Sequence, residues 1–200
     1  MATLPEPAIA ALLQPYLTVP SAILPQLSSY LDLLLKWNAR TNLTAIRNPE
    51  EIVRRHFGES LFAARHLDPK VLTVLDLGSG AGFPGLPIAI FHPEIQVTLA
   101  ESQNKKVSFL REVVRTLGLS TEIWPNRTEL LPTARQFDTV TLRAVDNMAA
   151  AVATAESRAT HQLMLLTSAA AAPALHEFSR QSRIPIPESQ DRILLIADRV

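Results

Sequence analysis

The chain has 200 residues, with 19 basic side chains, 19 acidic side chains and no cysteine. This length suits one domain with a small appendage, and an apolar content of 47% is enough for a sizeable core. The lack of cysteine excludes disulfides, thiolate zinc sites and cysteine nucleophiles. A formal net charge of zero argues against a basic coat for indiscriminate nucleic-acid binding, although it is compatible with a local basic patch.

The apolar runs of the sequence are too short to cross a bilayer. The N-terminal segment also lacks the basic residues that precede the apolar part of a secretory signal. We therefore expect a soluble, cytoplasmic protein with no membrane partner.

Residues 1–68 carry helical patterns. Leucines recur between Leu27 and Leu35 with spacings of four, seven and eight residues, which is typical of one helix face. Asn48 and Pro49 precede two glutamates, a combination that indicates a helix start with an asparagine cap. We predict a helical N-terminal cap over residues 1–68, on the RNA or substrate side of the molecule.

The pattern changes near residue 71, and residues 69–200 predict a second unit in which strands and helices alternate. The predicted strands are Val71–Leu77, Ile95–Glu101, Thr121–Trp124, Phe137–Ala144, Gln162–Thr167 and Asp191–Val200. The predicted helices are Lys105–Leu117, which Gly118 ends, and Met148–Ala159. This alternation predicts an α/β fold with a parallel sheet that is covered on both faces.

Four of the six glycines lie together between positions 78 and 85, directly after the first predicted strand. Glycine permits positive φ angles and close approach of a ligand to the main chain, and open α/β sheets bind ligands at this edge. Gly80, Gly82 and Gly85 match the dinucleotide spacing G-x-G-x-x-G, and Glu101 lies 21 residues after Gly80. A ligand site is therefore expected here, with a purely structural turn as the alternative.

The residues around the turn favour a cationic cofactor over a dinucleotide. Asp76, two residues before the first glycine, would repel a nearby pyrophosphate, unless its carboxylate serves as a turn anchor or helix cap. The P-loop pattern is absent from the sequence. S-adenosylmethionine carries an amino group and a sulfonium and no phosphate, and Glu101 is positioned to accept hydrogen bonds from two ribose hydroxyls. A dinucleotide remains the alternative occupant.

Several segments, in order, resemble the glucose-inhibited division protein B family, the guanine-N7 methyltransferases of bacterial small-subunit ribosomal RNA. Two of their patterns, W-N-x-x-x-N-L-T and G-F-P-G-x-P, are typical of that family, whereas D-x-G-x-G occurs in many methyltransferases. The segments are Lys36–Ile46, Arg55–Ser60, Asp76–Ile90, Glu101–Val113, Asn126–Glu129 and Leu142–Val145.

The resemblance implies a Rossmann-like, seven-stranded methyltransferase sheet with a helical N-terminal extension. It implies S-adenosylmethionine as the methyl donor, and N7 of a guanine in small-subunit ribosomal RNA as the acceptor. It assigns cofactor contacts to Gly78, Phe83, Thr128, Glu129 and Arg143. Gly80 and Glu101 complete the cofactor site that we expect, and no metal is expected.

The sequence departs from the family after the fifth predicted strand. The family often carries a lysine-glycine pair there, whereas this chain continues with Thr167, Ser168 and four alanines. A lysine contact to RNA or to the target base is therefore lost or supplied from elsewhere. The segment from Ala169 to Pro187 also matches the family poorly.

Methyl transfer to guanine N7 needs no general base, because N7 has a free lone pair and no proton to lose. Rate would come from positioning the two reactants, and no catalytic residue is assigned. RNA binding requires a basic surface, for which two groups of residues are candidates. These are Arg40, Arg47, Arg54 and Arg55 with His56 beside them, and Lys105, Lys106, Arg111 and Arg115.

Three other functions remain open at this point. The first is a small-molecule or protein methyltransferase on the same fold. The arginines of the cap favour an RNA substrate over this alternative. The second is a dinucleotide-dependent oxidoreductase. The third is an RNA-binding assembly factor that retains the pocket without catalysis.

Overall fold

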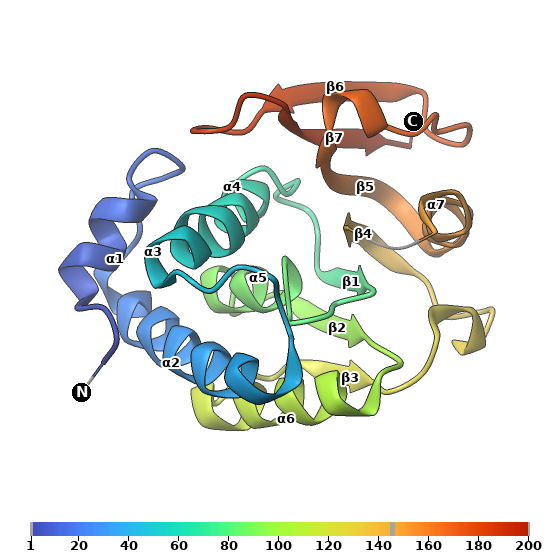
Figure 1. Ribbon diagram of the computed structural model, residues 1–200. Coiled ribbons are helices and arrows are strands. Elements are labelled where there is room, and N and C mark those ends of the chain that lie inside the picture. The colour runs from blue at the N-terminus through green and yellow to red at the C-terminus, as the bar shows by residue number, and fades with distance from the viewer. Residues whose placement is uncertain (1, 145–146, 200) are drawn as a thin grey trace.

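A computed structural model describes residues 2–144 and 147–199, in which seven strands form one sheet with the order β3-β2-β1-β4-β5-β7-β6 (Figure 1). The strands β1 to β5 are parallel, whereas β7 runs antiparallel to both β5 and β6. The strands are β1 Thr73–Leu77, β2 Gln96–Ala100, β3 Glu122–Trp124, β4 Phe137–Arg143, β5 Ala159–Ser168, β6 Arg180–Pro185 and β7 Arg192–Asp198. The order reverses direction at β1, which places a crevice between the carboxyl ends of β1 and β4.

The helices follow the predicted cap and crossover segments. They are α1 Glu6–Leu13, α2 Leu24–Thr41, α3 Pro49–Ile52, α4 Glu59–Ala64, α5 Gly85–Phe91, α6 Asn104–Leu117 and α7 Met148–Arg158. A π-helical segment, Val53–Gly58, joins α3 to α4. The predicted cap of α3 is confirmed, because Asn48 Oδ1 accepts a hydrogen bond from the backbone N of Glu51 at 2.9 Å. Gly118, with φ 64°, ends α6 as predicted.

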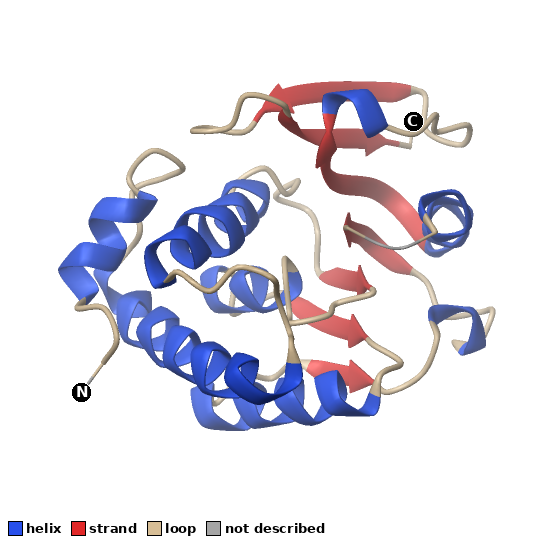
Figure 2. Cartoon of the chain, in the orientation of Figure 1, coloured by secondary structure: helices blue, strands red, loops and turns tan. Residues whose placement is uncertain are grey.

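The sheet is covered on both faces, with the N-terminal helices, α5 and α6 on one side and α7 on the other (Figures 1 and 2). The N-terminal helices share one continuous core with the sheet. The buried ring of Tyr30 in α2 lies 5.0 Å from the Phe57 ring and 5.2 Å from the Phe83 ring, measured between centroids. The same core continues to Met164 in β5 and Leu194 in β7. The cap therefore docks on the sheet through apolar packing, and the predicted boundary at residue 68 falls between α4 and β1.

The α/β class and the seven-stranded Rossmann-like sheet are confirmed, with two corrections. The expectation of an entirely parallel sheet is wrong, because the last two strands form an antiparallel hairpin. One of them, β6, was not predicted from the residues, since most of its side chains are exposed at the sheet edge and show no alternating pattern. Val145 of the family-like segment and Val200 of the last predicted strand lie outside the described residues. None of the described helices combines the length and apolar character needed to cross a membrane.

Candidate functional site

The glycine turn connects β1 to α5 and combines two kinds of glycine. Gly82 and Gly85 are required by packing, because an added Cβ would lie 2.3 and 2.4 Å from leucine side chains. At Gly80, with φ 58°, the only atom near an added Cβ would be a backbone oxygen at 3.8 Å. Gly80 therefore has open space in front of it, and its left-handed backbone exposes the main chain of the turn. The last two glycines of the dinucleotide-like pattern serve the fold.

Asp76 anchors this turn from within the sheet. Its side chain is fully buried, and its two oxygens accept hydrogen bonds from the backbone N of Gly85 at 3.1 Å and from Thr141 Oγ1 at 2.9 Å. Burial raises the pKa of Asp76 to about 6, against the opposing effect of these hydrogen bonds. Asp76 therefore does not face a cationic ligand, and the alternative role as turn anchor is correct.

The position of Asp76 nevertheless bears on which ligand the turn accepts. In dinucleotide folds the pyrophosphate binds at the N-terminus of the helix that follows the glycine turn. Here the Asp76 carboxylate already accepts from the first backbone N–H of α5, at Gly85. A phosphate would meet this carboxylate instead of free N–H groups. The start of α5 is thus unsuited to a pyrophosphate.

Glu101 follows the last residue of β2 and links that strand to the glycine turn. It is buried, and its Oε2 accepts a hydrogen bond from the backbone N of Gly80 at 2.9 Å. Its Oε1 accepts from the backbone N of Gln103 at 2.8 Å. A carboxylate has about four acceptor positions, so both oxygens retain capacity for ligand hydroxyls.

A cavity of about 380 Å³ opens beside this carboxylate, at the carboxyl ends of β1 and β2 and the segment that follows β3. We call it the Glu101 cavity. Its lining includes four of the predicted site residues, Gly78, Glu101, Thr128 and Glu129. Asn126 also lines it and was not singled out from the sequence, although it lies in a segment that resembles the family.

A second cavity, of about 240 Å³, lies on the other side of Gly78 and is bounded by the cap. We call it the His56 cavity. Its lining includes the remaining predicted residues, Gly80, Phe83 and Arg143, and again Gly78. The cap and α6 contribute Leu43, Thr44, His56 and Lys106. The two cavities share Gly78, so the structure brings all seven predicted site residues to one continuous stretch of the sheet edge.

Arg143, at the end of β4, holds the cap against the His56 cavity. Its NH2 atom lies 2.6 Å from His56 Nδ1 and donates to the backbone oxygen of Arg55 at 3.0 Å. The same atom lies 3.5 Å from Oε2 of Glu59, whose side chain is only 3% exposed. Arg192 Nε lies 2.8 Å from the other Glu59 oxygen, without the alignment of a hydrogen bond. Arg143 thus anchors a carboxylate, and a cofactor contact by the same side chain stays a prediction.

Burial lowers the pKa of both Arg143 and His56. Burial lowers the pKa of Arg143 to about 10, so the guanidinium stays charged at neutral pH. Burial and the neighbouring cations, Arg143 first among them, lower the pKa of His56 to about 2. The imidazole is therefore neutral, and its Nε2 lies 2.7 Å from Thr44 Oγ1.

Phe83 lies between the cap and the cavity. Its ring stacks on His56, with centroids 4.9 Å apart, and on Tyr30 at 5.2 Å. The Arg143 guanidinium lies 5.8 Å from the ring centroid, within reach of a cation–π interaction. With 7% exposure, Phe83 serves core packing first, and its cofactor contact also stays a prediction.

A family model described as rRNA small subunit methyltransferase G (GidB) matches residues 23–184. The chain belongs to this family. The relatives named "Ribosomal RNA small subunit methyltransferase G" include one from Stenotrophomonas maltophilia, 46% identical over 66% of this chain and 62% of its own length. Another, from Xylella fastidiosa, is 50% identical over 61% of this chain and 57% of its own length. The chain thus spans about 57 to 62% of the length of these relatives.

Solved structures share the fold with this GidB family member. A putative O-methyltransferase from Klebsiella pneumoniae superposes with a TM-score of 0.61 at 15% identity, over 86% of this chain and 90% of its own. The Thermus thermophilus methyltransferase RsmC, described in complex with AdoMet and guanosine, gives a TM-score of 0.51 at 20% identity. That match covers 64% of this chain and 37% of the other. Both confirm the Rossmann-like methyltransferase fold.

The site of this GidB family member fits S-adenosylmethionine. A buried carboxylate, Glu101, lines the Glu101 cavity with acceptor capacity to spare, and the exposed main chain of Gly78 connects this cavity to the next. The start of α5 is closed to a pyrophosphate by Asp76. A cofactor with a ribose and without phosphates matches both features.

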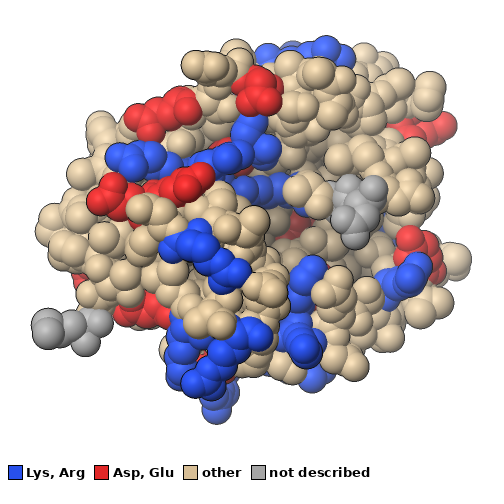
Figure 3. Space-filling model, in the orientation of Figure 1, with Lys and Arg blue, Asp and Glu red and all other residues tan. Residues whose placement is uncertain are grey.

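The basic residues of this chain are distributed unevenly. Arg54 and Arg55 of the first predicted group pair with acidic side chains, at 3.5 to 4.0 Å, which reduces their net charge. Figure 3 shows a mixture of basic and acidic side chains in the upper part and a gathering of Lys and Arg lower down, over α2 and α6. Within α2 and α6, the exposed basic residues that form no ion pair with the described residues are Lys36, Arg40, Lys105, Arg111 and Arg115.

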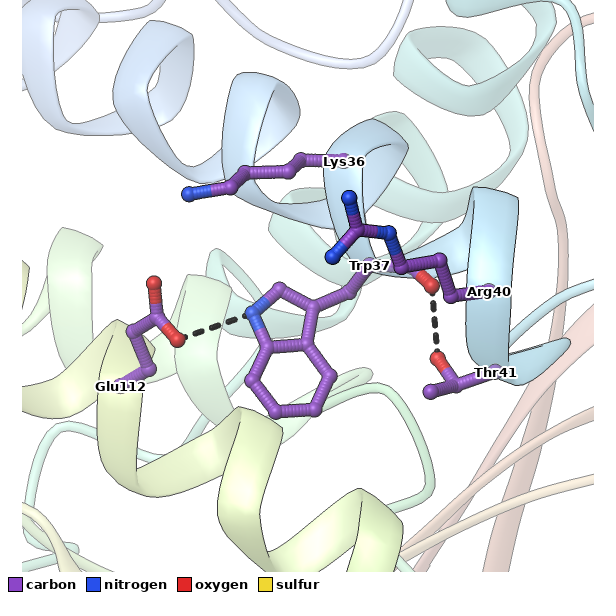
Figure 4. Close-up of a pocket in the computed structure, with 5 residues that line it drawn as sticks. All are labelled: Lys36, Trp37, Arg40, Thr41 and Glu112. Atoms are coloured by element: carbon purple, nitrogen blue, oxygen red, sulfur yellow. Dashed lines mark hydrogen bonds between the residues drawn. The ribbon is translucent and has the colours of Figure 1, made fainter.

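Trp37 sits at the contact between α2 and α6, beneath two of these cations (Figure 4). Its Nε1 donates to Glu112 Oε2 at 2.9 Å, and its ring lies 5.8 Å from the Phe109 ring. The side chains of Lys36 and Arg40 flank the indole. Trp37 thus packs at the edge of the cap core and joins the two helices that carry the unpaired cations.

Thr44 was not singled out from the sequence as a site residue, although it lies in the N-L-T segment that resembles the family. Its hydroxyl is bound to His56 and lines the His56 cavity. The only sequence signal was that segment, because a threonine in a loop has no distinguishing pattern of its own. His56, which lies beside the first predicted basic group, is held by Arg143 and Thr44 in the wall of the cavity, and an RNA contact by its side chain stays a prediction.

Proposed function

We propose that this chain transfers a methyl group from S-adenosylmethionine to N7 of a guanine in small-subunit ribosomal RNA. Membership of the GidB family and the names of its relatives support the reaction and the substrate. The observation that carries the proposal is the glycine turn, where Asp76 closes the start of α5 to phosphate and Glu101 offers a buried acceptor beside a cavity. S-adenosylmethionine, when bound, supplies an activated methyl group.

The residues of this chain divide the binding of the cofactor between the two cavities. In the Glu101 cavity, Glu101 accepts from the ribose, while Thr128 and Glu129 line the remaining wall. Gly78 lies in both linings, so a ligand can extend past it without meeting a side chain. In the His56 cavity, Phe83 and Arg143 bound the end of the site where the target base enters.

The lining of the His56 cavity agrees with a reaction that removes no proton. Among the described residues this lining holds no carboxylate. His56 is neutral, but both of its ring nitrogens are engaged, by Arg143 and by Thr44. The described part of the lining therefore offers no group that is free to act as a general base, and a nucleophile such as N7, which carries a lone pair and no proton, needs none. The contribution of the protein is to hold and orient the two reactants.

The RNA side of the molecule is proposed to be the cap, residues 1–68, together with α6. The unpaired cations of α2 and α6 form a basic face that extends from the cap towards the carboxyl edge of the sheet, where Lys106 lines the His56 cavity. Such a face provides phosphate contacts without a high overall charge. A ribosomal substrate also implies that the protein acts in the cytoplasm, without a membrane partner.

The proposal is tested by transfer of tritium from labelled S-adenosylmethionine to immature small ribosomal subunits and to their RNA, followed by mapping of 7-methylguanosine. We expect one guanosine to be modified. Cofactor binding without transfer to any form of ribosomal RNA would refute the substrate, and transfer to another atom of the base would refute the N7 assignment. The same experiment with a protein extract or small molecules as acceptors tests the other methyltransferase classes.

A further inference from the structure

The Thr44 hydroxyl is the centre of a hydrogen-bond network that leaves it one free direction. Its Oγ1 accepts a hydrogen bond from the backbone N of Ile46 at 3.2 Å and lies 2.7 Å from His56 Nε2. Thr44 is half-buried and lines the His56 cavity together with Gly80, Phe83 and Arg143.

Arg143 decides which of the two partners donates in the contact between His56 and Thr44. A guanidinium has only donors, so His56 Nδ1, 2.6 Å from Arg143 NH2, must accept. A neutral imidazole with an accepting Nδ1 carries its proton on Nε2. His56 therefore donates from Nε2 to Thr44 Oγ1.

The Thr44 hydroxyl then has both of its acceptor positions filled, by His56 Nε2–H and by the Ile46 N–H. Its own hydrogen finds no acceptor among the described residues, since the remaining bonds of Thr44 are made by its backbone with Asn38. Threonine hydroxyls normally serve as donors or acceptors, but this one is restricted to donation. The direction left for that donation is the His56 cavity.

We propose that the Thr44 hydroxyl reads the target base, by donating a hydrogen bond to O6 of guanine. This inference rests on the proposed function and names the group that selects guanine at that site. O6 lies beside N7 on the same edge of the base, where guanine presents two acceptors and adenine presents N7 next to an amino donor. A hydroxyl that can only donate pairs with guanine and opposes the amino group of adenine.

The network explains why a threonine can discriminate here, although serine and threonine ordinarily contact either purine. With an acceptor position free, the hydroxyl could rotate and accept from an adenine amino group. The hydrogen bonds from Ile46 and His56 remove that option, and Arg143 fixes the His56 tautomer that supplies one of them. Arg143 and His56 are therefore positioning residues for Thr44.

The test compares base analogues in single-turnover methyl transfer. Small-subunit RNA is prepared with guanosine, inosine or 2-aminopurine at the modified position, once mapping has located it. All three bases keep N7, but only guanosine and inosine keep O6. We expect wild type to prefer guanosine and inosine over 2-aminopurine, and the Thr44→Val variant to lose about 5- to 10-fold of that preference. Thr44→Ser should retain it.

Two further measurements separate this role from others. The affinity of the Thr44→Val variant for S-adenosylmethionine should stay within about twofold of wild type, because the lost hydrogen bond belongs to the base. Thr154→Val is the matched control, since Thr154 Oγ1 donates to its own helix at Ala150 O, 3.0 Å away, and does not line the cavity. That variant should behave as wild type with every base.

Several outcomes would overturn the inference. One is that the rate with guanosine divided by the rate with 2-aminopurine is the same in wild type and in Thr44→Val. The same holds if neither protein methylates 2-aminopurine at all. Another is a weakened affinity for S-adenosylmethionine in Thr44→Val with an unchanged base preference, which would assign the hydroxyl to the cofactor. Failure of wild type to methylate guanosine RNA would instead contradict the proposed function.

Discussion

The Glu101 cavity and the His56 cavity meet at Gly78, but they are built in different ways. The first is formed by the carboxyl ends of neighbouring parallel strands and by the segments that directly follow them. The second adds to the glycine turn a loop after α2, the π-helical segment, α6 and the end of β4, so its lining residues lie between Leu43 and Ala144 in the sequence. The difference indicates that the sheet by itself supplies the Glu101 cavity, whereas the His56 cavity, where the target base is proposed to enter, is complete only when the cap is docked.

In addition to the apolar packing, the buried carboxylate of Glu59 in α4 ties the cap to the sheet. It lies between the guanidinium groups of Arg143 and Arg192, which come from β4 and β7. Removal of one member of a buried ion pair leaves an uncompensated charge. Four perturbations test this division between the two cavities.

The largest effect is expected for Glu59→Gln, which leaves Arg143 and the partly buried Arg192 without their shared carboxylate. We expect the free energy of unfolding to fall by about 3 kcal/mol, measured by urea denaturation. Glu51→Gln is the matched control, because its ion pair with Arg55, at 3.9 Å, is half exposed. That variant should lose less than about 1 kcal/mol. Equal losses in the two variants would contradict the role of Glu59.

Asp76→Asn tests the anchor that both cavities share. The folded-state pKa of Asp76, about 6, lies above the usual value of 3.8, so the folded protein holds this proton more tightly than the unfolded chain. Stability from this group is present below about pH 4 and is lost as the pH rises to about 6. The unfolding free energy of wild type relative to Asp76→Asn should therefore drop by about 2.4 kcal/mol between pH 4 and pH 7. A constant difference would contradict the buried, proton-binding anchor.

His56 tests the His56 cavity alone. Its folded-state pKa, about 2, lies below the usual 6.5, so on acidification the unfolded chain takes up a proton that the folded protein refuses. As the pH falls from 6.5 to 5, the free energy of unfolding of wild type should therefore decrease by about 2 kcal/mol relative to that of His56→Gln. Nitrogen NMR should show a neutral ring with the proton on Nε2 at pH 5. A protonated ring, or a proton on Nδ1, would contradict the network that fixes Thr44.

Glu101→Gln tests the Glu101 cavity, and its expected effect, on the free energy of cofactor binding, is the smallest of the four. An amide keeps one acceptor but loses the charge, so affinity for S-adenosylmethionine should weaken about tenfold in calorimetry, corresponding to about 1.4 kcal/mol. The preference between guanosine and 2-aminopurine should not change, because Thr44 lies in the other cavity. Glu94→Gln, at an exposed carboxylate outside both cavities, serves as the control. Unaltered affinity in Glu101→Gln would remove Glu101 from the cofactor site.

The same division separates what could be predicted from the sequence and what could not. The five central strands are apolar and β-branched, and the caps at Asn48 and Gly118 have local signals, so they were found from residues alone. Strand β6 is exposed at the sheet edge and has no such signal. The role of Asp76 depends on burial, which a sequence does not state.

The network around Thr44 could not be predicted for a related reason. The tautomer of His56 follows from one contact to Arg143, a residue 87 positions further along the chain. No periodicity or spacing encodes a contact of that kind. By contrast, Gly80 and Glu101 are connected by one hydrogen bond and both follow the carboxyl ends of adjacent strands, so the strand pattern was sufficient to bring them together.

The proposed function requires that the site above β1 bind a sulfonium cofactor and not a phosphate-bearing one. Calorimetric titration of the wild-type chain with S-adenosylmethionine, and in parallel with NAD and NADP, tests it most directly. Saturable binding of one S-adenosylmethionine per chain, with no heat from either dinucleotide, is the predicted result. Binding of a dinucleotide with indifference to S-adenosylmethionine would contradict the account.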